Sequence, residues 1–301
     1  MKGKKIVSTL LALLLLASLP VSALAAEWDI GKGDITVNAG SGGQTVTQGS
    51  GAAIPDSAPV ITGTSKENNV TINAEKDQTA NVTLSGANID VSSAGKAAVS
   101  TAGEGNVSIE LNGESTLRSD YEHAGLEKNN GGSLTIADED KNGKLTAEGG
   151  KYGAGIGGGD EGNMNGTINI RGNAKVIAAS GRRGAGIGAG DEENLNGTVT
   201  ITDNADVIAV SGKNGAGIGS GCEASFKGTI IISGNAKVTA RTGVSEYDGN
   251  LYTFAAALGA TDDDVFNGNI MILGNAKLTT GVVEKNSVTR ENPLGKLLEN
   301  M

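Results

Sequence analysis

Acidic side chains recur at one position of a repeat in this chain of 301 residues. Each acidic group follows directly on a Gly-rich heptapeptide, which occupies residues 153–159, 184–190 and 215–221 and so recurs at one fixed spacing. A degraded fourth copy, residues 256–259, follows the third after a longer gap. The acidic residues after the four copies are Asp160, Glu161, Asp191, Glu192, Glu193, Glu223, Asp262, Asp263 and Asp264.

A fixed period places these carboxylates on the same turn of successive repeats. Like charges stacked at strand spacing repel each other unless a cation or a wide solvent shell intervenes. Carboxylate and carbonyl oxygens at such spacing are the hard ligands that Ca²⁺ prefers. The pattern therefore predicts calcium as a candidate cofactor at these residues, and the alternative is a solvated acidic edge that keeps the protein soluble.

Aromatic and basic residues give a second set of candidates, for ligand binding. Only 3% of the residues are aromatic, so a long row of exposed rings for sugar stacking is excluded. The candidate ligand-binding residues are Tyr152, Arg182, Arg183, Tyr247 and Tyr252. A glycan bound here would depend more on hydrogen bonds and charge than on stacking. The net charge of −10 argues against nucleic acid as a partner.

Conventional catalytic groups are few. The single histidine, His123, would need Asp120 or Glu122 beside it to act as a general base, and we expect an exposed turn residue instead. The single cysteine, Cys222, makes an internal disulfide impossible, so stability must come from the core. We expect Cys222 to be a small filler at a degenerate position of the acidic turn.

The elements that position these residues follow from the repeat, which is typical of a stacked architecture. Apolar residues alternate with Thr, Ser or Asn in short runs, as in strands with one buried face. The first apolar column runs Val82/Leu84, Val107/Ile109, Leu134/Ile136, Ile168/Ile170, Val199/Ile201, Ile230/Ile232, Ile270/Ile272. The second runs Ile89, Leu117, Leu145, Val176, Val207, Val238, Leu278, and the third Val99, Leu126, Ile156, Ile187, Ile218, Leu258. Three short strands per coil of about 27–31 residues predict an all-β fold, a parallel β-helix, right-handed because parallel crossovers almost always are.

Corners and insertions complete each coil. A fourth apolar column, Met164, Leu195, Phe226 and Phe266, is expected to plug a corner. Turn asparagines at Asn112, Asn173, Asn204, Asn235 and Asn275 predict a buried amide ladder, with plain surface turns as the alternative. The heptapeptide glycines are expected to serve close backbone packing. An insertion at about 244–252 predicts a loop that projects from one coil.

The ends of the chain are distinct from the repeats. Residues 1–26 have the charged start, apolar stretch and small-residue cleavage site of a secretory signal, so we expect an exported, extracellular protein without a membrane span. Residues 27–75 are expected to form the N-terminal cap and first coils, with Trp28 over the core end. Residues 76–281 are expected to form the repeat coils, and residues 282–301 a C-terminal capping helix or tail.

The order of motifs resembles a known family. Residues 81–91, 107–113, 124–128 and 153–157 are similar to the carbohydrate-binding β-helix domain of clostridial secreted proteins, within the pectate-lyase-like superfamily. The Gly-Ala-Gly-Ile-Gly blocks resemble those of surface proteins of gut Firmicutes. The resemblance implies a right-handed parallel β-helix that binds plant-type polysaccharides, including acidic ones, together with calcium.

Three functions are open at this point. The first is non-catalytic polysaccharide binding or adhesion at the cell surface. The second is a structural solenoid or spacer without a ligand. The third is a calcium-dependent lyase acting on uronates, in which a carboxylate–Ca²⁺ cluster acidifies a proton and a basic residue such as Arg182 or Arg183 removes it.

Overall fold

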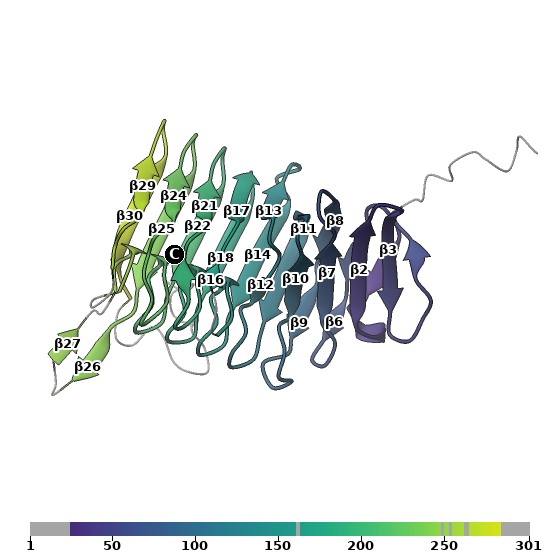
Figure 1. The fold of residues 1–301 in the computed structure, drawn as a ribbon, viewed down its shortest axis with the longest axis horizontal. Coiled ribbons are helices and arrows are strands. Elements are labelled where there is room, and N and C mark those ends of the chain that lie inside the picture. Colours follow the sequence, from purple (N-terminus) through teal and green to yellow (C-terminus); the bar gives the residue numbers. More distant parts are fainter. Residues whose placement is uncertain (1–24, 161–162, 248–249, 253–254, 262–264, 284–301) are drawn as a thin grey trace, which may run out of the picture.

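The chain winds into a β-solenoid of about seven turns, built from parallel strands as in a right-handed parallel β-helix (Figure 1). The computed structural model describes residues 25–160, 163–247, 250–252, 255–261 and 265–283. Within these residues the only helix is one 3-10 turn, η2 (Ile30–Lys32). The predicted fold class is therefore confirmed.

Three faces make up each coil. The first face contains β8 (Thr79–Ser85), the start of β11 (Asn106–Arg118), β13 (Ser133–Asp138), β17 (Thr167–Gly172), β21 (Thr198–Ile201), β24 (Thr229–Ile232) and β29 (Asn269–Ile272). The second contains β9 (Asn88–Asp90), the end of β11, β14 (Gly143–Glu148), β18 (Lys175–Ala179), β22 (Asp206–Val210), β25 (Lys237–Thr242) and β30 (Lys277–Val282). The third contains β2 (Ile35–Gly40), β7 (Val70–Ala74), β10 (Val99–Gly103), β12 (Leu126–Lys128), β15 (Ile156–Gly157), β19 (Ile187–Gly188), β23 (Ile218–Gly219) and β28 (Leu258–Gly259).

The core follows the predicted columns closely. The first column pairs coil to coil as predicted from Ile109 through Ile136 to Ile272, and the third from Val99 through Ile156 to Leu258. The first step of the first column is wrong by two positions, because Val82 pairs with Ile109 and not with Val107, and Leu84 pairs with Leu111. The corner column also holds, because short pairings link Met164, Leu195, Phe226 and Phe266 in succession. The rings of Phe226 and Phe266 stack with their centroids 5.1 Å apart. Each fully buried aliphatic side chain contributes about 1.5–3 kcal/mol.

One register prediction in the second column is wrong. Leu117 pairs with Ala147, whereas Leu145 pairs with Ser115. The turn after β13 contains more residues than the equivalent corner inside β11. Leu117 is therefore farther in sequence from its partner Ala147 than Ile109 is from its partner Ile136. All four side chains of the second face still point to the core, since a shift by two positions preserves the face of a strand.

The asparagine ladder exists but is not buried as predicted. The amide of each residue from Asn204 onward donates to the preceding one at 3.2–3.4 Å, linking Asn173, Asn204, Asn235 and Asn275. Asn204 and Asn235 are exposed, and the alanine after each, such as Ala205, fills the corner of the core. Asn112 pairs with Ser85 inside a strand instead.

The first end of the solenoid is closed by antiparallel strands. β3 (Gly43–Gln48) pairs antiparallel with β2, and β4 (Ile54–Pro55) pairs with β3. β1 (Glu27–Asp29) pairs with β5 (Val60–Thr62), and its Trp28 is buried and donates to Asp56 Oδ2 at 2.9 Å, as expected for a cap. Near the last coils, the insertion forms an antiparallel hairpin of β26 (Ser245–Tyr247) and β27 (Asn250–Tyr252) that stands out from the solenoid (Figure 1).

Candidate functional site

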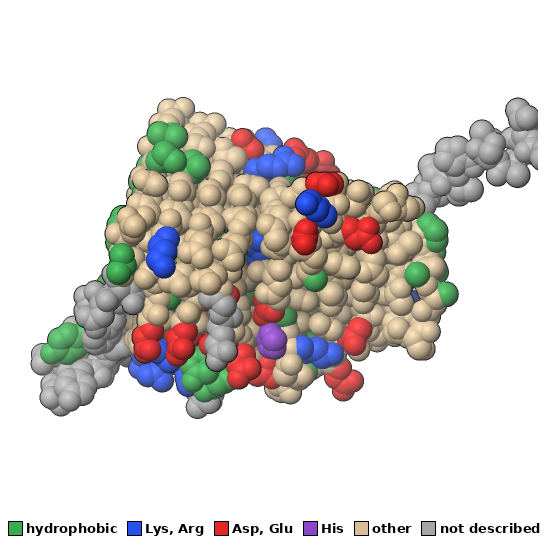
Figure 2. All heavy atoms as spheres, viewed as in Figure 1, with side chains coloured by type: hydrophobic (Ala, Val, Ile, Leu, Met, Phe, Trp, Pro, Cys, Tyr) green, Lys and Arg blue, Asp and Glu red, His purple; other side chains and the backbone are tan. Residues whose placement is uncertain are grey.

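The Gly-rich heptapeptides form narrow loops, each closed by one backbone hydrogen bond. Ala154 N–H donates to the carbonyl of Gly158 at 2.9 Å, and Ala185 and Ala216 repeat this bond one and two coils on. The turn before one loop lies beside the turn after the loop of the next coil, because Asp191 N–H donates to the carbonyl of Tyr152 at 2.8 Å. We call the surface formed by these turns the loop edge. Charged groups of both signs and the single histidine gather along the lower border of Figure 2.

Close stacking of the loops explains their glycines. Gly188 takes a φ of 136°, and a Cβ there would collide with the carbonyl oxygen of Gly219 in the next coil. Gly157 and Gly219 occupy the same conformation in their own coils. The predicted packing role of the glycines is confirmed, and the loops form a rigid support for the side chains beside them.

A tyrosine–lysine cluster, formed by Tyr121, Lys151 and Tyr152, lies on the loop edge. The two rings meet edge to face with centroids 4.7 Å apart. The ammonium of Lys151 donates to the hydroxyl of Tyr121 at 2.6 Å and to that of Tyr152 at 2.7 Å. These hydrogen bonds raise the pKa of Lys151 above its ordinary value. The cluster therefore presents a fixed positive charge beside two ring surfaces, with Tyr121 41% exposed.

A cationic row extends from this cluster along the solenoid axis. The row consists of one residue from each of three successive coils: Lys151, Arg182 and Lys213. Backbone hydrogen bonds set these coils side by side, since Arg182 N–H donates to the carbonyl of Lys151 at 3.2 Å and Asn214 N–H donates to the carbonyl of Arg182 at 3.0 Å. Strand pairing sets the rise from one coil to the next at about 4.8 Å. Arg182 and Lys213 are exposed.

Arg183 supplies the positive charge that the stacked carboxylates require. Its guanidinium binds Asp191 Oδ2 at 2.9 Å and Glu223 in the next coil, and it lies 5.8 Å from the ring centre of Tyr152. Asp191 is only 2% exposed. Burial raises the pKa of Asp191 to about 6 against the attraction of Arg183, with a further contribution from nearby carboxylates. Cys222 is half-buried and contacts the same guanidinium at 3.5 Å.

The side chain of Glu193 turns inward against the backbone of the loop. Its Oε2 accepts a hydrogen bond from Gly190 N–H at 2.7 Å, and the residue is 6% exposed. The carboxylate fills the space left by Gly158 in the preceding coil, where a Cβ would collide with Oε2. Burial raises the pKa of Glu193 to about 7.

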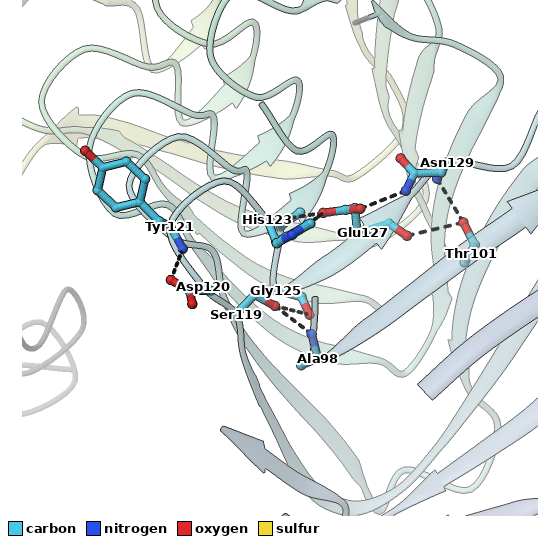
Figure 3. Close-up of polar contacts among 10 residues, drawn as sticks. Ala98, Thr101, Ser119, Asp120, Tyr121, His123, Gly125, Glu127 and Asn129 are labelled. Atoms are coloured by element: carbon cyan, nitrogen blue, oxygen red, sulfur yellow. Dashed lines mark hydrogen bonds and ion pairs between the residues drawn. The ribbon is translucent and has the colours of Figure 1, made fainter. Parts of the chain in front are cut away.

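His123 lies in a turn as expected and its side chain is 34% exposed, but it is paired with a carboxylate. His123 Nδ1 lies 2.8 Å from Glu127 Oε2, while the backbone of Ala124 and the amide of Asn129 donate to the same carboxylate (Figure 3). The hydrogen bond to Glu127 raises the pKa of His123. Figure 3 shows Tyr121 pointing away from this pair, so the pair stabilises the base of the turn while the tyrosine remains outside.

Three of the predicted calcium ligands are engaged by other groups of the protein. Asp191 and Glu223 share Arg183, and Glu193 faces backbone glycine. Among the residues that the structure describes, no group of three or more His, Cys, Asp or Glu side chains is placed to hold a metal ion. Asp160 and Glu192 lie on the same edge, whereas Glu161, Asp262, Asp263 and Asp264 lie outside the described residues. The calcium prediction therefore stays a prediction.

The predicted ligand-binding residues are brought together only in part. Tyr152 and Arg183 are in contact and Arg182 is next to them, whereas Tyr252 is exposed on the projecting hairpin. Tyr247 lies in β26, and its side chain is outside the described part. Sequence reasoning missed Tyr121 and Lys151. Tyr121 precedes Tyr152 by one repeat period, so that spacing was the available signal.

The described part of the chain contains no long apolar helix of the kind that spans a bilayer. Comparison with known proteins adds no name, since no family model, no curated protein and no solved structure matches the chain. The resemblance to the clostridial carbohydrate-binding family therefore stays an expectation.

Proposed function

We propose that this is an exported, non-catalytic protein that binds acidic polysaccharides along the loop edge. The observation that carries the proposal is the alignment of the tyrosine–lysine cluster with the cationic row, Lys151, Arg182 and Lys213. A polyuronate presents one carboxylate on each sugar, and the row presents one cation on each coil. The polymer would lie parallel to the solenoid axis.

The chemistry of the cluster suits such a ligand. Tyrosine rings offer apolar surface to sugar faces, and their hydroxyls offer hydrogen bonds. Each exposed ion pair contributes roughly 0.2–1 kcal/mol, so binding would be modest and would weaken with salt. Arg183 pairs with both Asp191 and Glu223, so its charge offsets part of the negative charge that would otherwise repel the polymer.

The two alternatives receive less support. Of the two bases that a lyase could use, Arg183 is already engaged by Asp191 and Glu223, which leaves only the exposed Arg182. A structural solenoid without a ligand would not require ammonium and phenol groups to be held together on a rigid loop. It predicts no saturable binding to any polysaccharide.

Paired charge variants test the proposal. Lys151→Ala/Arg182→Ala/Lys213→Ala removes the row, while Lys175→Ala/Lys237→Ala/Lys277→Ala removes three exposed cations from the outer surface of the second face. We expect the first variant to bind polygalacturonate roughly 3- to 150-fold more weakly in calorimetric titration, from three ion pairs at the stated energies. The second variant should bind like the wild type. Equal affinities for all three proteins would refute the proposal.

A further inference from the structure

The last coil of the solenoid leaves the apolar core exposed. Ile272 and Phe266 continue two core columns, yet they are 47% and 53% exposed. Their counterparts one coil earlier, Ile232 and Phe226, are fully buried. Hydrophobic side chains mark this end of the molecule at the left of Figure 2. We call the surface that β28, β29, β30 and Phe266 present here the open end.

The three strands of the open end are edge strands. Within the described part of the chain, β28, β29 and β30 each pair on one side only, with β23, β24 and β25 of the preceding coil. An edge strand offers backbone N–H and C=O groups on which another chain can pair. The open end therefore combines an apolar centre with three strand edges.

These edges lack the usual protection against pairing. Edge strands that must stay single commonly carry charged residues or proline, including charges that point inward. Apart from Lys277, the three strands contain no charged residue and no proline. The side chains that continue the core are Ile270, Ile272 and Leu278, all apolar.

We propose that two copies of this protein join through their open ends. The first end of the solenoid offers no matching surface, because β3 and β4 close it and Trp28 is buried there. A surface that must match itself produces an isologous dimer with two-fold symmetry. The two-fold axis reverses the sense in which one coil winds relative to the other, so the edge strands meet antiparallel, an arrangement that strand hydrogen bonds allow.

The size of the open end suits such a dimer. Stable interfaces bury about 800 Å² on each partner and involve about 20–30 residues a side. The described part of the last coil, residues 255–261 and 265–283, contains a number of residues within this range. Stacking would bury Ile272 and Phe266 as their counterparts in the preceding coil are buried. Association stops at two copies, because a two-fold interface is closed.

Sedimentation velocity of the full chain over a range of micromolar concentrations tests the dimer. Ile272→Lys places a charge within the open end. Met271→Lys is the matched control, because this side chain lies on the same strand but alternates with the core residues. We expect Ile272→Lys to raise the Kd of the wild-type dimer about 10-fold or more, since the two-fold axis places the residue in the interface twice. Met271→Lys should remain a dimer.

Other outcomes would overturn the proposal. A wild-type monomer at every concentration would do so, and the cap expected at residues 282–301, of which 284–301 lie outside the described residues, would then be the candidate to cover the open end. A dimer that both Lys variants weaken equally would have its interface elsewhere. If Ile272→Lys does not fold, hydrogen exchange of the wild type decides. The amides of β29 and β30 should exchange more slowly as the concentration rises, and exchange independent of concentration would exclude pairing there.

Discussion

Replacing Glu193 by Gln should stabilise the protein at alkaline pH and stabilise it much less at acidic pH. The Glu193 carboxylate is enclosed between Gly158 and Gly190, and burial raises its pKa to about 7 from an ordinary 4.5. A glutamine has the same shape and still accepts the hydrogen bond of Gly190 N–H. The variant thus removes a buried charge without opening a cavity.

The sign and size of the stability change follow from proton linkage. A raised carboxyl pKa means that the folded protein binds more protons than the unfolded chain between about pH 4.5 and 7, so stability rises as the pH falls through this window. At about 1.36 kcal/mol per pKa unit, ionised Glu193 costs the folded state about 3 kcal/mol at pH 8. About 2 kcal/mol of this cost disappears by pH 5.5. For a domain of this size that corresponds to about 5 °C in Tm.

Urea unfolding at pH 5.5 and pH 8 measures the effect. The wild type should be less stable at pH 8, and His123 acts in the same direction because its raised pKa stabilises the folded state only while the imidazole is protonated. The difference between wild type and Glu193→Gln isolates the carboxylate. Glu192→Gln, an exposed neighbour with the same charge change, is the control. Parallel pH profiles for wild type and Glu193→Gln would refute the reasoning.

Three further predictions concern the same edge. Gly158→Ala should destabilise the folded protein by about 2 kcal/mol or more, because the added Cβ would meet the Glu193 carboxylate. In a double-mutant cycle, Glu193→Ala should restore much of this lost stability, and the absence of any rescue would contradict the contact. Arg183→Ala should cost more stability at pH 8 than at pH 5.5, since it leaves buried Asp191 ionised and unpaired only at the higher pH; equal losses in urea would contradict this. Millimolar Ca²⁺ should raise the Tm only if acidic residues other than the partners of Arg183, such as Glu161 and Asp262 to Asp264, bind it. Gln and Asn variants of these four residues should then abolish any shift while Asp191→Asn retains it; a shift abolished by Asp191→Asn would contradict the role of Arg183 as counter-ion.

The sequence was sufficient for the fold because the repeat carries the register. Columns such as Ile156–Ile187–Ile218 recur at the period of the coil, and strand pairing follows directly. Leu117 and Leu145 show the limit of this reasoning, since a turn of different length shifts the pairing while an apolar residue remains nearby. Register is therefore predictable within identical repeats and uncertain where turn length changes.

The candidate site was predictable only in outline. Recurring carboxylates correctly marked the loop edge, but sequence does not show that Glu193 turns inward over Gly158 while Arg183 bridges Asp191 and Glu223. Those contacts depend on which side chain of one coil fits into the space beside a residue of the neighbouring coil. The turn asparagines show the same limit, because the following alanine takes the core position and leaves the ladder outside.

Calorimetric titration with polygalacturonate and with its fully methyl-esterified form tests the central claim most directly. The two polymers share a backbone, but only the first carries the carboxylates that the cationic row would bind. The account predicts saturable binding to polygalacturonate that weakens with salt, and little or no binding to the ester. Equal binding to both polymers, or binding to neither, would contradict it.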